Sequence, residues 1–112
     1  KNSKSDFITT AEYIANVILT ETGYSPFARM KYRGGNYVQS RQLFAVQLFA
    51  VMKNNIAFNK YTKSELLTKT GRMIHKNRAT VISSIKHIND RCDTDKVFRD
   101  LYDRIENKIK MK

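Results

Sequence analysis

Apolar residues recur along the chain at the three- and four-residue spacing of helix faces. The first stripe predicts a helix that ends near Gly23, with these positions on its buried face: Phe7, Ala11, Ile14, Ala15 and Ile18. The run 43–52 is apolar on nearly every side, which is typical of a buried central helix. Ser40 is the expected cap at its start, and Asn54 and Asn55 suit its end.

Two helices separated by a short connection are expected next. Thr62 and Glu65 have the S/T-x-x-E spacing of a capping box, which predicts a helix of about two turns that ends at Gly71. After the connection 72–77, Asn77 is a suitable N-cap for a second helix. The buried face of this second helix is expected to hold Val81, Ile85 and Ile88. Its outward face is expected to hold Ala79, Ser83, Lys86 and Asp90.

A last helix is expected at about residues 95–110, with Asp93 or Thr94 as its cap. Its apolar positions are Val97, Leu101 and Ile105, flanked by Phe98, Tyr102 and Ile109. A loop is expected near residues 33–36, where Gly34 and Gly35 interrupt regular structure. No segment alternates at period two, so residues 1–112 are predicted to form one all-α domain, a compact bundle of about five helices.

The distribution of charge along the chain gives the first indication of function. The chain carries a net charge of +11, and residues 29–92 alone hold thirteen Lys/Arg against Glu65 and Asp90. Residues 1–28 have a net charge of −1 and residues 93–112 of +1. Such a basic centre between balanced flanks favours a polyanionic partner. A merely solubilising surface is the plainer interpretation, but it does not explain the asymmetry.

Other chemistry has weak support in the sequence. The single cysteine, Cys92, allows no internal disulfide, which suits a reducing cytoplasm. The acids around it, Asp90, Asp93 and Asp95, are better explained by helix capping than by a metal. We therefore expect no metal, no cofactor and no enzymatic activity, and no membrane span. Because the chain starts at Lys1 without a methionine, further domains or protein partners outside it are allowed for.

The two helices around Gly71 have the layout of a helix–turn–helix at about residues 63–91, whose second helix enters the DNA major groove. Lys76 and the first-turn amides are suited to a phosphate. Asn77 has the groups to pair with adenine, Arg78 with guanine, and Ala79 with a thymine methyl. Asn77 is equally suited to capping, and the helical phase of Arg78 brings it near the apolar stripe. Helix, turn and helix is also a frequent arrangement in any all-α bundle.

The stretch "GRMIHKNRATV" from Gly71 to Val81 resembles the signature of the C-terminal DNA-binding domain of the bacterial replication initiator DnaA. Upstream, "SRQLFAVQLFAV" is similar to the P-R-Q helix of that family, with Arg41 and Gln42 matching and Ser40 in place of proline. The resemblance covers about residues 7–92. It implies a Trp-repressor-like helix–turn–helix and a basic loop whose arginine enters the minor groove, with Arg33 as the counterpart and Lys31 second.

Two departures narrow what the resemblance implies. The family's Asp-His pair is Asn77-Arg78 here, and no phosphate-loop pattern is present. The expected function is therefore duplex recognition linked to replication initiation or its regulation, with its own target, in a bacterial cytoplasm or from a phage or mobile element. The predicted base contacts are Asn77, Arg78, Ala79 and Arg33. The predicted phosphate contacts are Lys31, Arg41, Lys63, Lys76, Thr80, Ser83 and Lys86.

The alternative function is a helical module that binds proteins or single-stranded nucleic acid or RNA. The apolar run 43–52 and the tyrosines around the basic loop, Tyr24, Tyr32 and Tyr37, support this alternative. Such tyrosines stack on unpaired bases in some proteins, but more often they pack on the core.

Overall fold

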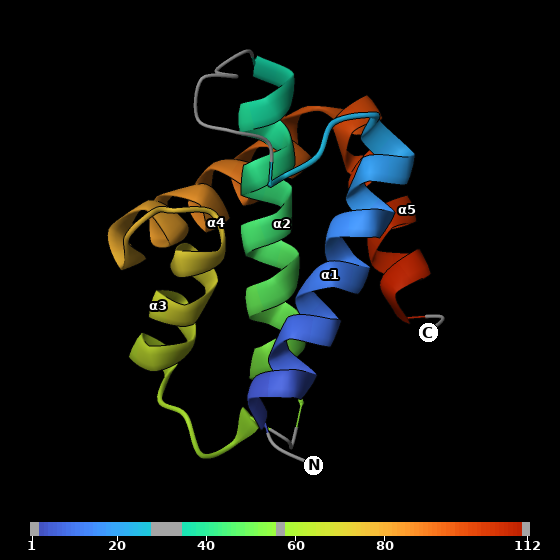
Figure 1. Cartoon of the computed structure of the whole chain (residues 1–112). Coiled ribbons are helices and arrows are strands. Elements are labelled where there is room, and N and C mark those ends of the chain that lie inside the picture. Colours follow the sequence, from blue (N-terminus) through green and yellow to red (C-terminus); the bar gives the residue numbers. More distant parts are fainter. Residues whose placement is uncertain (1–2, 28–34, 56–57, 111–112) are drawn as a thin grey trace.

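The described part of the chain, residues 3–27, 35–55 and 58–110 of a computed structural model, forms five helices and no strands (Figure 1). The helices are α1 (Ser3–Thr22), α2 (Gly35–Lys53), α3 (Lys63–Met73), α4 (Arg78–Thr94) and α5 (Lys96–Lys110). This architecture confirms the all-α prediction. No helix within the described ranges combines the length and the apolar character that a membrane span requires.

Helix α2 lies at the centre of the bundle, in contact with α1, α3 and α4 (Figure 1). Its side chains Leu43, Phe44, Ala45 and Leu48 are completely buried. The prediction that 43–52 is a central buried helix is confirmed, because only a helix packed on several sides can bury an apolar surface that runs all round it. Helix α5 packs mainly against α1 and α4.

The start of α2 differs from the prediction. The helix begins at Gly35, so Gly35 and Asn36, expected in a loop, form its first turn. Ser40, expected to be the cap, is an interior residue with no exposed surface, and its Oγ lies 3.2 Å from Oγ1 of Thr22. Its hydroxyl therefore pairs with the end of α1 instead of capping α2.

The ends of α1 and α5 test two further predictions. Gly23 ends α1 as expected, at a φ of 80° that favours glycine. Helix α5 is capped by Asp95, whose Oδ1 accepts a hydrogen bond from the Phe98 N–H at 3.1 Å. The expectation that Asp93 or Thr94 is the cap is wrong, because α4 continues through both residues.

The buried face of α5 differs from the predicted stripe at the start of the helix and agrees with it at Ile105. Phe98 and Ile105 are buried, whereas Val97, expected inside, is 80% exposed. Leu101 packs against the core only in part. The packing of α5 on two helices at once decides which of several neighbouring apolar residues turns inward, which spacing alone leaves open.

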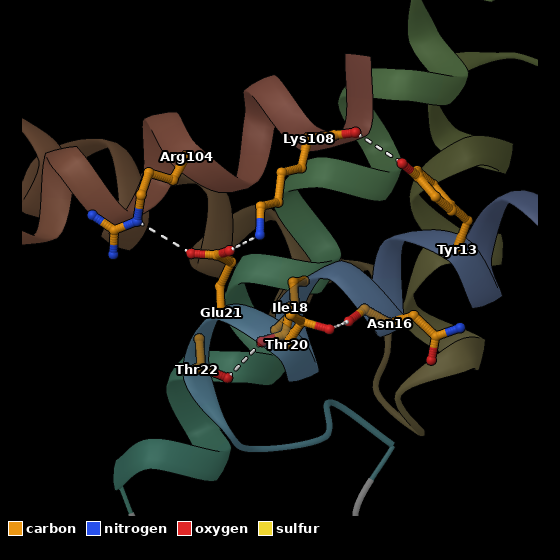
Figure 2. A network of polar contacts seen from close by, with 8 residues as sticks. All are labelled: Tyr13, Asn16, Ile18, Thr20, Glu21, Thr22, Arg104 and Lys108. Atoms are coloured by element: carbon orange, nitrogen blue, oxygen red, sulfur yellow. Dashed lines mark hydrogen bonds and ion pairs between the residues drawn. The ribbon is translucent and has the colours of Figure 1, made fainter. Parts of the chain in front are cut away.

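A polar cluster joins the end of α1 to α5 (Figure 2). Glu21 accepts a hydrogen bond from Arg104 at 3.1 Å and forms an ion pair with Lys108. The Tyr13 hydroxyl donates to the Lys108 carbonyl at 2.8 Å. The Glu21 side chain is largely buried, and the contacts with Lys108 and then Arg104 lower the pKa of its carboxyl.

Candidate nucleic-acid interface

Helix α3 starts with the predicted capping box. The Thr62 N–H donates to Glu65 Oε1 at 2.8 Å, and the Glu65 N–H donates to Thr62 Oγ1 at 3.1 Å. These bonds satisfy two donors at the helix start and lower the pKa of the Glu65 carboxyl, mainly through the Thr62 backbone. They fix the first turn of α3, from which Lys63 projects as an exposed cation.

The turn between α3 and α4 is a Schellman motif. The Lys76 N–H donates to the Gly71 carbonyl at 2.8 Å, and the His75 N–H donates to the Arg72 carbonyl at 3.3 Å. His75 takes the left-handed position of the motif, with a φ of 58°. The prediction that Gly71 ends the helix is therefore wrong: α3 runs to Met73, and the connection consists of residues 74–77.

Gly71 has a different role, in the packing of the turn. A Cβ at this position would lie 2.5 Å from the Lys76 carbonyl oxygen and 3.1 Å from that of Asn77. The backbone of the turn folds back onto α3 at a distance that only glycine permits. This close approach brings the start of α4 against the end of α3.

Asn77 is the N-cap of α4, as expected. Its Oδ1 accepts from the Thr80 N–H at 2.9 Å and from the Thr80 hydroxyl at 3.1 Å. The oxygen that adenine recognition needs is therefore already engaged in the cap. Of the two roles considered for Asn77 from sequence, the structure contains the capping one.

Arg78 is exposed and does not lie along the buried stripe of α4. Its Nη1 donates to the Ser64 hydroxyl in the first turn of α3. The guanidinium therefore reaches from the start of α4 back to the first turn of α3, where Lys63 is the residue next to Ser64.

The two faces of α4 follow the sequence pattern closely. Val81 and Ile88 are buried and Ile85 is partly buried. The outward residues Ala79, Ser83, Lys86 and Asp90 are all exposed.

Sequence reasoning missed Ile82, which is 51% exposed on α4. Helical spacing places it one turn after Arg78 and Ala79 and one turn before Lys86. The signal was present in the sequence, since an isoleucine outside the buried stripe must face solvent or a partner. It is a large apolar side chain within an otherwise polar and cationic surface.

Arg41 is brought from α2 to the start of α4 but is only 7% exposed. It lines a cavity of about 210 Å³ together with Lys76, Thr80 and Ser84. The structure therefore brings together three of the predicted phosphate contacts, Arg41, Lys76 and Thr80, and encloses the first of them. Arg33 and Lys31 lie outside the described residues.

Two cations of the basic middle are committed to packing. The Lys69 ammonium lies 4.7 Å from the ring centre of Tyr61. Arg91 donates to Gln39 Oε1 at 2.6 Å, and its guanidinium lies 4.2 Å from the ring centre of Phe98. These two residues help to hold α3 and α4 in place. The number of cations in residues 29–92 is therefore larger than the number open to a bound molecule.

Of the tyrosines around the basic loop, Tyr32 lies outside the described residues, and the other two are packed together. Tyr24 and Tyr37 contact each other edge to face, with ring centres 5.0 Å apart. Cys92 is half-buried, and burial raises the pKa of its thiol, which disfavours the reactive thiolate. Within the described ranges, His, Cys, Asp and Glu form no group of three placed to hold a metal ion.

Comparisons with protein-family models, with curated proteins and with solved structures found no match for this chain. The function of the α3–α4 surface is therefore inferred from its own residues.

Proposed function

We propose that this protein binds double-stranded DNA through α3 and α4, with α4 in the major groove. One observation carries the proposal: the exposed face of α4, which holds Ala79, Ile82, Ser83 and Lys86, continues directly from the cations at its start. In Figure 1, α4 begins at the edge of the bundle away from α5, beside α3. This is the placement that a recognition helix needs.

The start of α4 is the centre of the proposed phosphate site. Lys76 supplies positive charge directly before α4, and the dipole of α4 adds to it. Lys63 adds a cation at the start of α3, next to the Ser64 hydroxyl that Arg78 contacts. Arg41 and Thr80 line the same cavity as Lys76, and in this proposal they hold the Lys76 side chain toward the phosphate. Ser83 and Lys86 extend the proposed site along the outward face.

Bases are read by Ala79 and Arg78 in this proposal, and Ile82 joins them. Ala79 and Ile82 offer apolar contacts to thymine methyl groups, and Arg78 offers a fork to guanine when it exchanges Ser64 for the base. Asn77 holds the helix start and leaves base reading to its neighbours. The resemblance to the DnaA C-terminal domain adds Arg33 and Lys31 as minor-groove contacts and suggests a role in replication initiation or its control, in a bacterial cytoplasm or from a mobile element.

Selection from a randomised duplex library tests sequence-specific recognition, and an enriched motif is expected. Lys76→Ala and Lys86→Ala should each weaken binding to every sequence, and the log–log slope of affinity against salt should fall by roughly 0.9 for each phosphate that the variant no longer neutralises. Lys96→Ala is the matched control, because it removes an exposed cation on α5, which lies on the other side of the bundle. A library that returns no motif would contradict specific recognition by this chain.

The alternative, a protein-binding or single-strand-binding module, loses one of its two supports. The apolar run 43–52 packs almost entirely into the core of the bundle, so it offers little surface for a partner. Tight binding to single strands with weak binding to the duplex would still favour that alternative.

A further inference from the structure

A groove lies between the C-terminal halves of α2 and α5, since α5 packs mainly on α1 and α4. Its volume is about 520 Å³. The groove is lined by Gln47, Ala50, Val51, Glu106, Ile109 and Lys110, and by the amide residues Asn54 and Asn55 beyond the end of α2. None of them belongs to the proposed DNA-binding surface on α3 and α4.

Gln47 lines this groove and is the unusual residue of the set. It is the one polar side chain in the run 43–52, and it is only 2% exposed. Within the described part of the chain, its Nε2 has no hydrogen-bond acceptor. Native proteins pair nearly all buried polar atoms, since an unpaired amide loses its bonds to water without replacement. Methionine would fill a similar space without that cost, so the amide calls for an acceptor.

The other lining residues indicate the chemistry of a molecule that would supply this acceptor. Ala50, Val51 and Ile109 provide apolar walls, and Lys110 provides a cation at the rim. A single water would satisfy the amide, but the groove is much larger than one water and lies within the size range of small-molecule sites. We propose that this groove binds a small molecule whose carbonyl or carboxylate oxygen accepts from Gln47 Nε2 and whose short apolar tail lies on Val51 and Ile109.

The head group of the ligand is decided by the two charges on α5. Lys110 favours a carboxylate, whereas Glu106, one turn earlier on the same helix, disfavours it. Hexanoate and hexanamide carry the two head groups on the same tail and therefore serve as probes. Each is titrated into the 15N-labelled full chain, and the Gln47 side-chain amide signal is identified by its loss in Gln47→Met.

Binding is expected to shift the Gln47 side-chain signal and the backbone signals of Val51 and Ile109. Gln47→Met should weaken both probes by about three- to tenfold, the effect of one buried hydrogen bond. Lys110→Gln should weaken hexanoate alone if a carboxylate is the natural head group, with Lys53→Gln as the matched control on α2. Equal effects on both probes would assign the site to neutral carbonyl compounds.

Ala50→Gln is a second variant. It places a larger side chain on the wall of the groove, which fills the ligand space while Gln47 is unchanged. It should abolish the shifts, and it protects the test if Gln47→Met does not fold. The proposal is overturned if neither probe shifts these signals, or if Gln47→Met binds both probes as the wild type does. In that case water is the partner of the Gln47 amide.

Discussion

Single residues in the turn between α3 and α4 decide how the helix pair is built. His75 occupies the left-handed position where glycine is usual, and Gly71 lies inside a helix where glycine is unusual. The exchange has a physical reason. At Gly71 the carbonyl oxygens of the turn lie so close to α3 that a Cβ would clash with them. At His75 a side chain only makes the left-handed backbone less favourable, so glycine matters more at position 71.

Gly71→Ala tests this explanation. Alanine normally stabilises a helix by about 1 kcal/mol relative to glycine. Here its Cβ would lie 2.5 Å from a backbone oxygen, so the clash should dominate and destabilise the protein by about 1–3 kcal/mol. Thermal unfolding followed by circular dichroism should show a fall in Tm of about 5–15 °C.

Gly35→Ala is the matched control, since a Cβ at that position meets nothing within 4 Å. Its Tm should be unchanged or higher. A Gly71→Ala variant as stable as the wild type would mean that the turn moves away without cost.

At the scale of the element, α4 is held on its inner face and left open on its outer face. Val81 and Ile88 fix its rotation, and Arg91 joins its last turns to α2 and α5. On the open face, Ile82 lies between Arg78, one turn earlier, and Lys86, one turn later. An exposed isoleucine at this place is expected to contribute to base preference more than to stability.

Ile82→Ala tests that contribution on the enriched duplex. Replacing a contacted thymine by deoxyuridine removes its methyl group, which should weaken the wild type by roughly fourfold, the value of one buried methyl. The variant should bind both duplexes alike. Val97→Ala, at an exposed valine on α5, should keep the preference.

The outcomes separate the Ile82 interaction from the function. If the wild type selects a motif but does not distinguish thymine from deoxyuridine at any position, DNA binding stands and the role assigned to Ile82 is wrong.

At the scale of the whole molecule, charge is distributed unevenly between the two sides of the bundle. On the α1–α5 side, Glu21 is paired with Arg104 and Lys108 (Figure 2). On the α3–α4 side, seven cations between Lys63 and Arg91 stand against three acids, Glu65, Asp90 and Asp93, and the Glu65 carboxylate serves the capping box. The bundle therefore neutralises one side and leaves the other positive, which favours binding of a polyanion in one orientation.

The Glu21 cluster gives a prediction about stability and pH. Its carboxyl pKa is lowered by folding, so its contribution is present above its ordinary value near 4.5 and is lost as the pH falls through the folded value. Glu21→Gln should cost about 0.5–1 kcal/mol at pH 7, because its two partners are about half exposed.

Urea unfolding at a series of pH values measures the effect. The difference between Glu21→Gln and the wild type should shrink toward zero in acid, whereas Glu12→Gln, at an exposed acid of the same helix, should have little effect at any pH. A difference that stays constant down to low pH would show that the charge of Glu21 does not contribute.

Features that depend on residues within one or two helical turns were readable from the sequence alone. The central apolar helix, the capping box at Thr62, the cap at Asn77 and the two faces of α4 all follow from spacing and local hydrogen bonding. The helix–turn–helix layout also follows, and it holds although Gly71 is not its stop.

Only the tertiary structure decided which polar groups remain open to a ligand. The sequence counts Arg41, Lys69 and Arg91 as cations of one basic region, but the fold encloses the first and packs the other two on aromatic rings. It also turns Ile82 outward at the centre of the candidate surface and leaves the Gln47 amide buried in a groove. The physical reason is the same in each case. Helical periodicity is a property of neighbours in the chain, whereas the partner of a long side chain is set by helices that are distant in sequence.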